Sequence, residues 1–155
     1  MFRELTPPEC FGELAEKPDA VLIDCRAPAE WHFTGTPDLS TIGKKALLLA
    51  IADESGRPNP EFVATVTSIA GHDTPLYLLC RVGGRSANAC QLLGQAGFTD
   101  LVNVTEGFEG RVDENGHRNT MEGWKFHGQV WRKPLTTFCL SIPREFHSAH
   151  PFRKS

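Results

Sequence analysis

Four short and almost uniformly apolar segments constrain this chain most. They are AVLID (20–24), ALLLAIA (46–52), PLYLLC (75–80) and LVNV (101–104). A strand with one face in water alternates apolar and polar residues, whereas a strand buried on both faces is apolar throughout. The stretch from Phe2 to Leu5 adds a candidate edge strand. The pattern predicts an α/β protein whose parallel sheet is covered by helices on both faces.

The stretches between these segments carry helix signals. Thr6, followed by Pro7 and by Glu9 three residues after it, predicts a helix start with a capping box. The remaining helical predictions are a turn in APAEWHF, a helix from Asn59 and Pro60 to about Ala70, and a helix over SANACQLLGQAG (86–97) that ends at Gly97.

Composition excludes several classes of protein. The net charge of −3 over 155 residues does not favour nucleic acid or an anionic membrane as partner. The longest apolar run, Ala46–Ala52, is far short of the roughly 20 residues of a membrane span, and the N-terminus lacks the order of a signal peptide. We therefore expect a cytoplasmic protein with no nucleic-acid partner and no membrane span.

The chain divides near residue 133. Residues 1–133 form the predicted domain, and residues 134–155 form a basic tail without clear periodicity. We expect the tail to be partly disordered, or to dock on a neighbour through Phe138, Leu140 and Ile142.

The cysteines and histidines do not predict a metal site. The five cysteines are an odd number without a CxxC pair, which argues against a disulfide framework and against zinc. The six histidines show no ligand spacing, so we expect no metal and no cofactor.

Three chemically active residues follow apolar segments. Asp24, Cys80 and Glu106 fall at or just past the carboxyl ends of predicted strands. Ligands of parallel sheets bind outside these ends, so this edge is the predicted functional site.

The segment CRVGGR is the strongest candidate. Cys80 is followed by a loop and a helix start, through Arg81, Val82, Gly83, Gly84, Arg85 and Ser86. A free thiol has a pKa of about 8.5 and is a poor nucleophile until it ionises. Two arginines, a helix N-terminus and glycines that let backbone N–H groups converge all favour an anionic sulfur.

A thiolate in such a loop can attack sulfane sulfur without any proton abstraction, because the donor already carries a leaving group. The product is a cysteine persulfide, a reversible sulfur modification. Arg81 and Arg85 are then suited to orient an anionic donor such as thiosulfate.

CRVGGR closely resembles the active-site loop of the rhodanese-like sulfurtransferases. LIDCRAPAEWHFTG is similar to the family's Asp-x-Arg motif, with Cys25 where Val is commoner, and VNVTEGFEG and GWKFHGQVW resemble later segments in the same order. The resemblance covers about residues 1–132.

This resemblance implies a doubly wound α/β domain with a mostly parallel five-stranded sheet. It further implies a persulfide on Cys80, a binding loop from Arg81 to Ser86, and supporting roles for Asp24 and Arg26, while Glu106 is a candidate structural hydrogen-bonding residue. The expected function is transfer of sulfur from a small sulfur-containing anion to a thiol or cyanide acceptor, a protein thiol included.

Two other functions are alternatives to sulfur transfer, and the sequence argues against only one of them. A phosphatase or arsenate reductase of the same fold is disfavoured, because its signature places five residues between cysteine and arginine, and Cys80 and Arg85 are separated by four. A non-enzymatic sulfur carrier, sensor or interaction module is not excluded. Cys25 is either a packed strand residue or a resolving thiol for Cys80.

Overall fold

The sheet of the computed structural model has five strands, and the model describes residues 1–133. The predicted tail, 134–155, lies outside the described residues. The strand order is β1-β6-β5-β2-β4, and every neighbouring pair is parallel. The strands are β1 (Arg3–Leu5), β2 (Val21–Asp24), β4 (Leu47–Leu48), β5 (Leu76–Leu79) and β6 (Leu101–Val104). The predicted α/β class with a five-stranded parallel sheet is confirmed.

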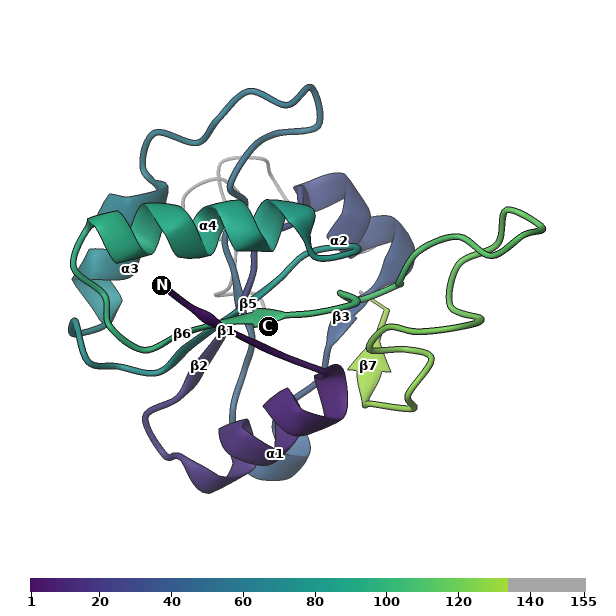
Figure 1. Ribbon diagram of the computed structural model, residues 1–155, viewed down its shortest axis with the longest axis horizontal. Helices are drawn as coiled ribbons and strands as arrows, with labels where there is room; N and C mark the ends of the chain where they lie inside the picture. The colour runs from purple at the N-terminus through teal and green to yellow at the C-terminus, as the bar shows by residue number, and fades with distance from the viewer. Residues whose placement is uncertain (134–155) are drawn as a thin grey trace.

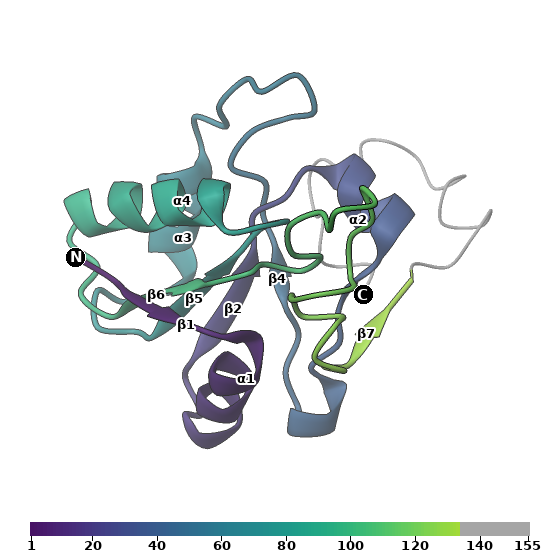
Figure 2. The ribbon, with the colours of Figure 1, turned by 45° about the vertical axis from the view of Figure 1, so that its right-hand side comes forward.

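Helices cover both faces of this sheet, as Figure 1 shows. Helix α1 (Pro7–Glu16) packs on one face, and α3 (Phe62–Ile69) and α4 (Gly84–Gln95) pack on the other. Helix α2 (Pro28–Thr34) lies beyond the carboxyl ends of the strands (Figure 2). No helix within residues 1–133 has the length and apolarity needed to cross a membrane.

The alternation of side chains along β5 decides which way the candidate nucleophile points. Tyr77 and Leu79 face α1, whereas Leu76 and Leu78 face α3 and α4. Because successive strand residues point to opposite faces, Cys80 falls on the α4 side, where it joins the core cluster with Ala89 and Cys90. The sulfur therefore lies under the start of the following helix.

The sequence predicted the start of helix α1 correctly and the start of helix α3 less well. The Thr6 hydroxyl accepts a hydrogen bond from the Glu9 N–H, and the Glu9 carboxylate accepts one from the Thr6 N–H, so the predicted capping box is confirmed. Asn59 is different. Its side chain bonds to the Glu61 N–H and to the Ala50 carbonyl, and the helix itself begins at Phe62.

Other boundaries also differ from the sequence prediction. Strand β4 keeps only two residues of the predicted 46–52 strand, because the chain turns along the edge of the sheet and bonds intermittently to Asp24 and Cys25. Helix α4 begins at Gly84, before the predicted Ser86. A small antiparallel sheet of β3 (Thr36–Pro37) and β7 (Trp131–Arg132) was not predicted.

The segment after β6 returns to the body of the domain through Trp124. Its ring is fully buried against the α1 side of the sheet, and its indole N–H donates to the Val130 carbonyl. Trp124 therefore anchors this segment on the sheet. Residues 111–122 extend away from the sheet (Figure 1).

Candidate active site

The turn between β5 and α4 encloses the sulfur of Cys80. Gly83 adopts a φ of +113°, a left-handed conformation that glycine tolerates best, and this bends the chain back over the thiol. Cys80 Sγ accepts hydrogen bonds from the N–H of Gly83 (3.1 Å) and the N–H of Ser86 (3.3 Å). Ser86 lies in the first turn of α4, so the sulfur takes the place of an N-terminal helix cap. Two N–H donors and the positive end of the helix dipole stabilise negative charge at this atom.

Asn103 holds the turn around Cys80 in place, and the sequence analysis did not identify it as a site residue. It is a buried polar residue in β6, next to the central strand. Its Nδ2 donates to the Gly83 carbonyl at 3.2 Å, and its Oδ1 accepts the Ser86 hydroxyl proton. A polar residue inside an otherwise apolar strand, LVNV, was the available signal, since a buried amide needs hydrogen-bond partners.

The Ser86 hydroxyl links Asn103 to the nucleophile. Its oxygen lies 3.2 Å from Cys80 Sγ. Because the hydroxyl proton is directed at Asn103, the contact to sulfur is satisfied when the Cys80 thiol donates to the hydroxyl oxygen. When the sulfur is anionic, its two backbone N–H donors remain in place.

The segment that follows β6 also binds the cysteine loop, through the backbone of residues 108–110. The N–H of Phe108 donates to the Cys80 carbonyl at 2.8 Å, and the N–H groups of Glu109 and Gly110 donate to the Arg81 carbonyl at 3.1 and 3.2 Å. Gly107 makes this approach possible. It has a φ of +70°, and a side chain on it would overlap the backbone of Arg81.

Arg85 does not stand free at the site. Its two terminal nitrogens bind both oxygens of Glu30, at 2.7 and 2.8 Å, in a bidentate ion pair. Burial opposes ionisation of Glu30, but the Arg85 guanidinium and the Ala27 N–H outweigh it and lower the pKa of that carboxyl. The pair in turn raises the pKa of Arg85. Both groups are therefore charged near neutral pH.

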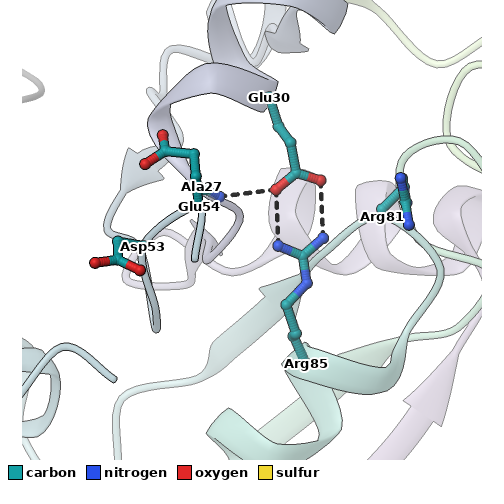
Figure 3. Close-up of a pocket in the computed structure, with 6 residues that line it drawn as sticks. All are labelled: Ala27, Glu30, Asp53, Glu54, Arg81 and Arg85. Atoms are coloured by element: carbon teal, nitrogen blue, oxygen red, sulfur yellow. Dashed lines mark hydrogen bonds and ion pairs between the residues drawn. The ribbon is translucent and has the colours of Figure 1, made fainter. Parts of the chain in front are cut away.

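A cavity of about 290 Å³ lies against this ion pair, and Figure 3 shows its lining. The lining residues are Ala27, Glu30, Asp53, Glu54, Arg81 and Arg85. Cys80 is 1% exposed and is not among them. The cysteine loop therefore contributes Arg81 and Arg85 to the cavity, but not Cys80 itself. Residues 111–122 contribute nothing to the lining.

Asp24 and Arg26 form a buried pair rather than a part of the cavity. Both side chains are fully buried, with Arg26 Nη2 2.7 Å from Asp24 Oδ2 and Nε 2.9 Å from Oδ1. The remaining donors of Arg26 bind the Thr34 hydroxyl and the Gly35 carbonyl, and its guanidinium stacks over Phe108, 4.3 Å from the ring centroid. The pair ties β2 to α2 and to the segment that supports the loop.

Glu106 binds the chain that returns to the domain after β6. Its carboxylate accepts a hydrogen bond from the Gly123 N–H at 2.9 Å and contacts His127 Nε2 at 2.8 Å. These contacts hold the returning chain, and the structural hydrogen-bonding role of Glu106 stays a prediction. Val82 is 40% exposed on the outside of the loop.

The other cysteines of the described part of the chain are free and buried. Cys25 continues β2 beside Cys80, since the paired register ends at Asp24 and Leu79. Burial, followed by the charges of Cys80 and Asp24, raises the pKa of the Cys25 thiol well above its ordinary value. Cys90 packs in the core, and burial raises its pKa to about 12. Within residues 1–133, no cluster of three His, Cys, Asp or Glu side chains is placed to hold a metal ion.

A parallel five-stranded sheet with a cysteine loop between its central strand and a helix N-terminus defines a rhodanese-like domain. Residues 4–138 match the family model described as the STR4 middle domain. The chain belongs to this family of rhodanese-like domains.

Individual relatives agree with this assignment. The crystal structure of Rv0390 from M. tuberculosis is 37% identical, covers 86% of this chain and 100% of its own, and superposes with a TM-score of 0.80. Rhodanese-like domain-containing protein 4, chloroplastic, from Arabidopsis thaliana is 27% identical over 85% of this chain, which spans only 26% of that protein. A polysulfide-sulfur transferase homodimer from Wolinella succinogenes shares the fold at 19% identity, with a TM-score of 0.58 over 88% of this chain and 82% of its own.

Proposed function

We propose that the protein is a sulfurtransferase that carries sulfane sulfur as a persulfide on Cys80. The observation that carries the proposal is the double N–H hydrogen bond to Cys80 Sγ at the start of α4. Such donors stabilise a thiolate and, after reaction, a persulfide anion. The polysulfide-sulfur transferase that shares this fold supports the choice of sulfur chemistry.

The reaction proceeds in two half-reactions. The Cys80 thiolate attacks the sulfane sulfur of a donor, a new S–S bond forms, and the donor's old bond to that sulfur breaks with its electron pair leaving on sulfite or on a thiolate. A thiol or cyanide acceptor then attacks the outer sulfur, and the Cys80 thiolate leaves. The loop from Arg81 to Ser86 binds the donor, and the Asp24–Arg26 pair supports the loop.

The cellular setting belongs to the same proposal. Four free cysteines in residues 1–133 suit a reducing compartment such as the cytoplasm. The donor is a small sulfur-containing anion and the acceptor a thiol, on a small molecule or on a protein.

A donor and acceptor panel tests the proposal. Wild-type protein and Cys80→Ser are incubated with thiosulfate, polysulfide or an organic persulfide, and sulfur uptake is followed by intact mass. We expect an adduct of about 32 Da, one sulfur atom, on the wild type alone, and its loss on addition of cyanide or thiol. Equal uptake by the two proteins would refute a role for Cys80. An adduct that no acceptor discharges would favour the carrier or sensor alternative.

A further inference from the structure

The cavity beside the cysteine loop has an unusual charge balance for a site that handles anions. Three carboxylates, those of Glu30, Asp53 and Glu54, face two guanidinium groups, those of Arg81 and Arg85. The lining thus carries a formal charge of minus one before any donor arrives. An unopposed pair of arginines would instead present two positive charges to the donor.

Glu30 is the carboxylate that sets this balance. It uses both oxygens on Arg85, and its Oε1 also accepts the Ala27 N–H at 2.9 Å at the start of α2. The pair is half-buried, with 21% of the Glu30 side chain and 38% of the Arg85 side chain exposed. Water therefore screens it less than a surface pair. A donor that needed Arg85 would have to compete with a carboxylate held in place by the protein.

The other charged side chains of the cavity are not held in a bidentate ion pair such as that of Glu30 with Arg85. Within residues 1–133, Arg81 makes no ion pair and no side-chain hydrogen bond, so its guanidinium is available to one negative group of a donor. Glu54 Oε2 accepts the Ala29 N–H at 3.0 Å. Asp53 accepts hydrogen bonds from the hydroxyl and N–H of Ser55 and from the N–H of Arg57, and the exposed Arg57 Nε lies 3.9 Å from its Oδ2. Figure 3 shows Asp53 and Glu54 on the far side of Glu30 from Arg81.

We propose that Glu30 is a specificity-determining residue: by occupying Arg85 it selects small organic persulfides over doubly charged oxyanions such as thiosulfate. The inference rests on the proposed sulfur transfer to Cys80 and adds the class of donor. Arg81 is left to hold one anionic group, and the acidic wall of Asp53 and Glu54 favours a donor that also carries an ammonium group. Within residues 1–133, a doubly charged donor meets three carboxylates in the cavity lining and one arginine, Arg81, that makes no ion pair.

A series of donors that differ in charge tests this inference. Thiosulfate carries two negative charges and releases sulfite, methanethiosulfonate carries one and releases methanesulfinate, and cysteamine persulfide carries an ammonium group and releases a thiolate. The rate of persulfide formation on Cys80 is measured by mass spectrometry for each donor. The readout is the ratio of the rates within one protein, because a lower folded fraction cancels from it.

Glu30→Gln is the decisive variant. Its Oε1 can keep the bonds to Ala27 and to Arg85 Nη1, while the negative charge is lost. We expect the thiosulfate to cysteamine persulfide ratio to rise about tenfold, the change that corresponds to roughly 1.4 kcal/mol, with methanethiosulfonate in between. An unchanged ratio would overturn the inference, because a merely structural Glu30 would affect all donors alike.

Two further variants separate release of Arg85 from a general change of charge. Glu54→Gln removes the same charge from the same cavity without freeing Arg85, so its rise should be clearly smaller. Glu30→Gln added to Arg85→Met should raise the ratio over Arg85→Met alone by no more than Glu54→Gln raises it over wild type. An equal rise in Glu54→Gln, or the full rise of Glu30→Gln persisting without Arg85, would contradict the inference while leaving sulfur transfer intact. No adduct on Cys80 with any donor would overturn the sulfur transfer proposal and this inference together.

Discussion

The Ser86 hydroxyl donates its proton to the side-chain carbonyl of Asn103, while the other end of the same amide holds the Gly83 carbonyl. One side chain of β6 thus fixes both ends of the turn whose N–H groups bind Cys80 Sγ. The position of Cys80, the proposed nucleophile, therefore depends on Asn103 from the neighbouring strand.

Asn103→Ala should loosen this turn. The substitution removes the bonds from Asn103 to the Gly83 carbonyl and to the Ser86 hydroxyl, while the Gly83 carbonyl keeps the Ala87 N–H. Because two hydrogen bonds are lost, we expect a loss of about 1–3 kcal/mol in the free energy of unfolding. Sulfur uptake by Cys80 should slow about tenfold, equivalent to roughly 1.4 kcal/mol. Urea denaturation and the rate of adduct formation measure the two effects.

Ser86→Ala is the matched control for Asn103→Ala. It removes the hydroxyl but keeps the backbone N–H of residue 86 and the bond from Asn103 to Gly83, so its effect on sulfur uptake should be smaller. If Ser86→Ala slowed uptake as much as Asn103→Ala, the anchor on Gly83 would not be what matters.

Gly107→Ala should damage the loop from its other side. The new methyl group would overlap the Arg81 backbone, and the residue would keep a left-handed φ of +70°. Overpacking against backbone costs about 1–3 kcal/mol, beyond the conformational strain. Gly116→Ala has a similar φ of +79° but open space around it, so it reports the strain alone. We expect thermal unfolding to show a larger loss for Gly107→Ala, and equal losses would exclude the contact with Arg81 as the cause.

Asp24→Asn should be strongly destabilising. It leaves the fully buried guanidinium of Arg26 without its counter-ion, and breaking a buried pair in this way costs about 3–5 kcal/mol. Asp100→Asn is the control, because Asp100 and Arg3 form an exposed pair at 3.5 Å, which is worth about 0–1 kcal/mol. Chemical denaturation would decide, and similar midpoints for the two variants would contradict the structural role of Arg26.

Glu13 should make stability depend on pH in the acid range. Hydrogen bonds from Arg3, with smaller contributions from Tyr77 and Lys17, lower the pKa of Glu13 from 4.5 to about 2. Because the folded state binds this proton less readily than the unfolded state, the stabilisation is complete above about pH 4.5 and is lost as the pH falls towards 2. Glu13→Gln should therefore be less stable than wild type at pH 7, and the difference should shrink over that interval. A difference independent of pH in urea titrations would show that the charge of Glu13 is not responsible.

Much of this organisation could be predicted from the sequence, because it depends on local chemistry. Uniformly apolar strands indicate burial on both faces, and Thr6 and Glu9 determine a helix start that the structure confirms. The spacing from Cys80 to Ser86 predicted a strand, a tight turn and a helix, and this is the order observed.

Boundaries that depend on the edge of the sheet could not be predicted in this way. The segment ALLLAIA is apolar enough for a full strand, but as an edge segment it has only one neighbouring strand, and only Leu47–Leu48 remains regular. The short pairing of β3 with β7 joins residues that are about a hundred positions apart, so no local sequence pattern predicts it.

The sequence by itself determined the parallel α/β fold and the cysteine loop, because hydrophobic period, capping residues and glycine positions act over a few residues. Only the tertiary structure decided what surrounds the loop. It brought Asn103 under the turn, placed Glu30 on Arg85 and moved Asp24 into a buried pair with Arg26. These contacts join side chains from different elements, and their partners are selected by burial and charge in the folded chain rather than by spacing along it.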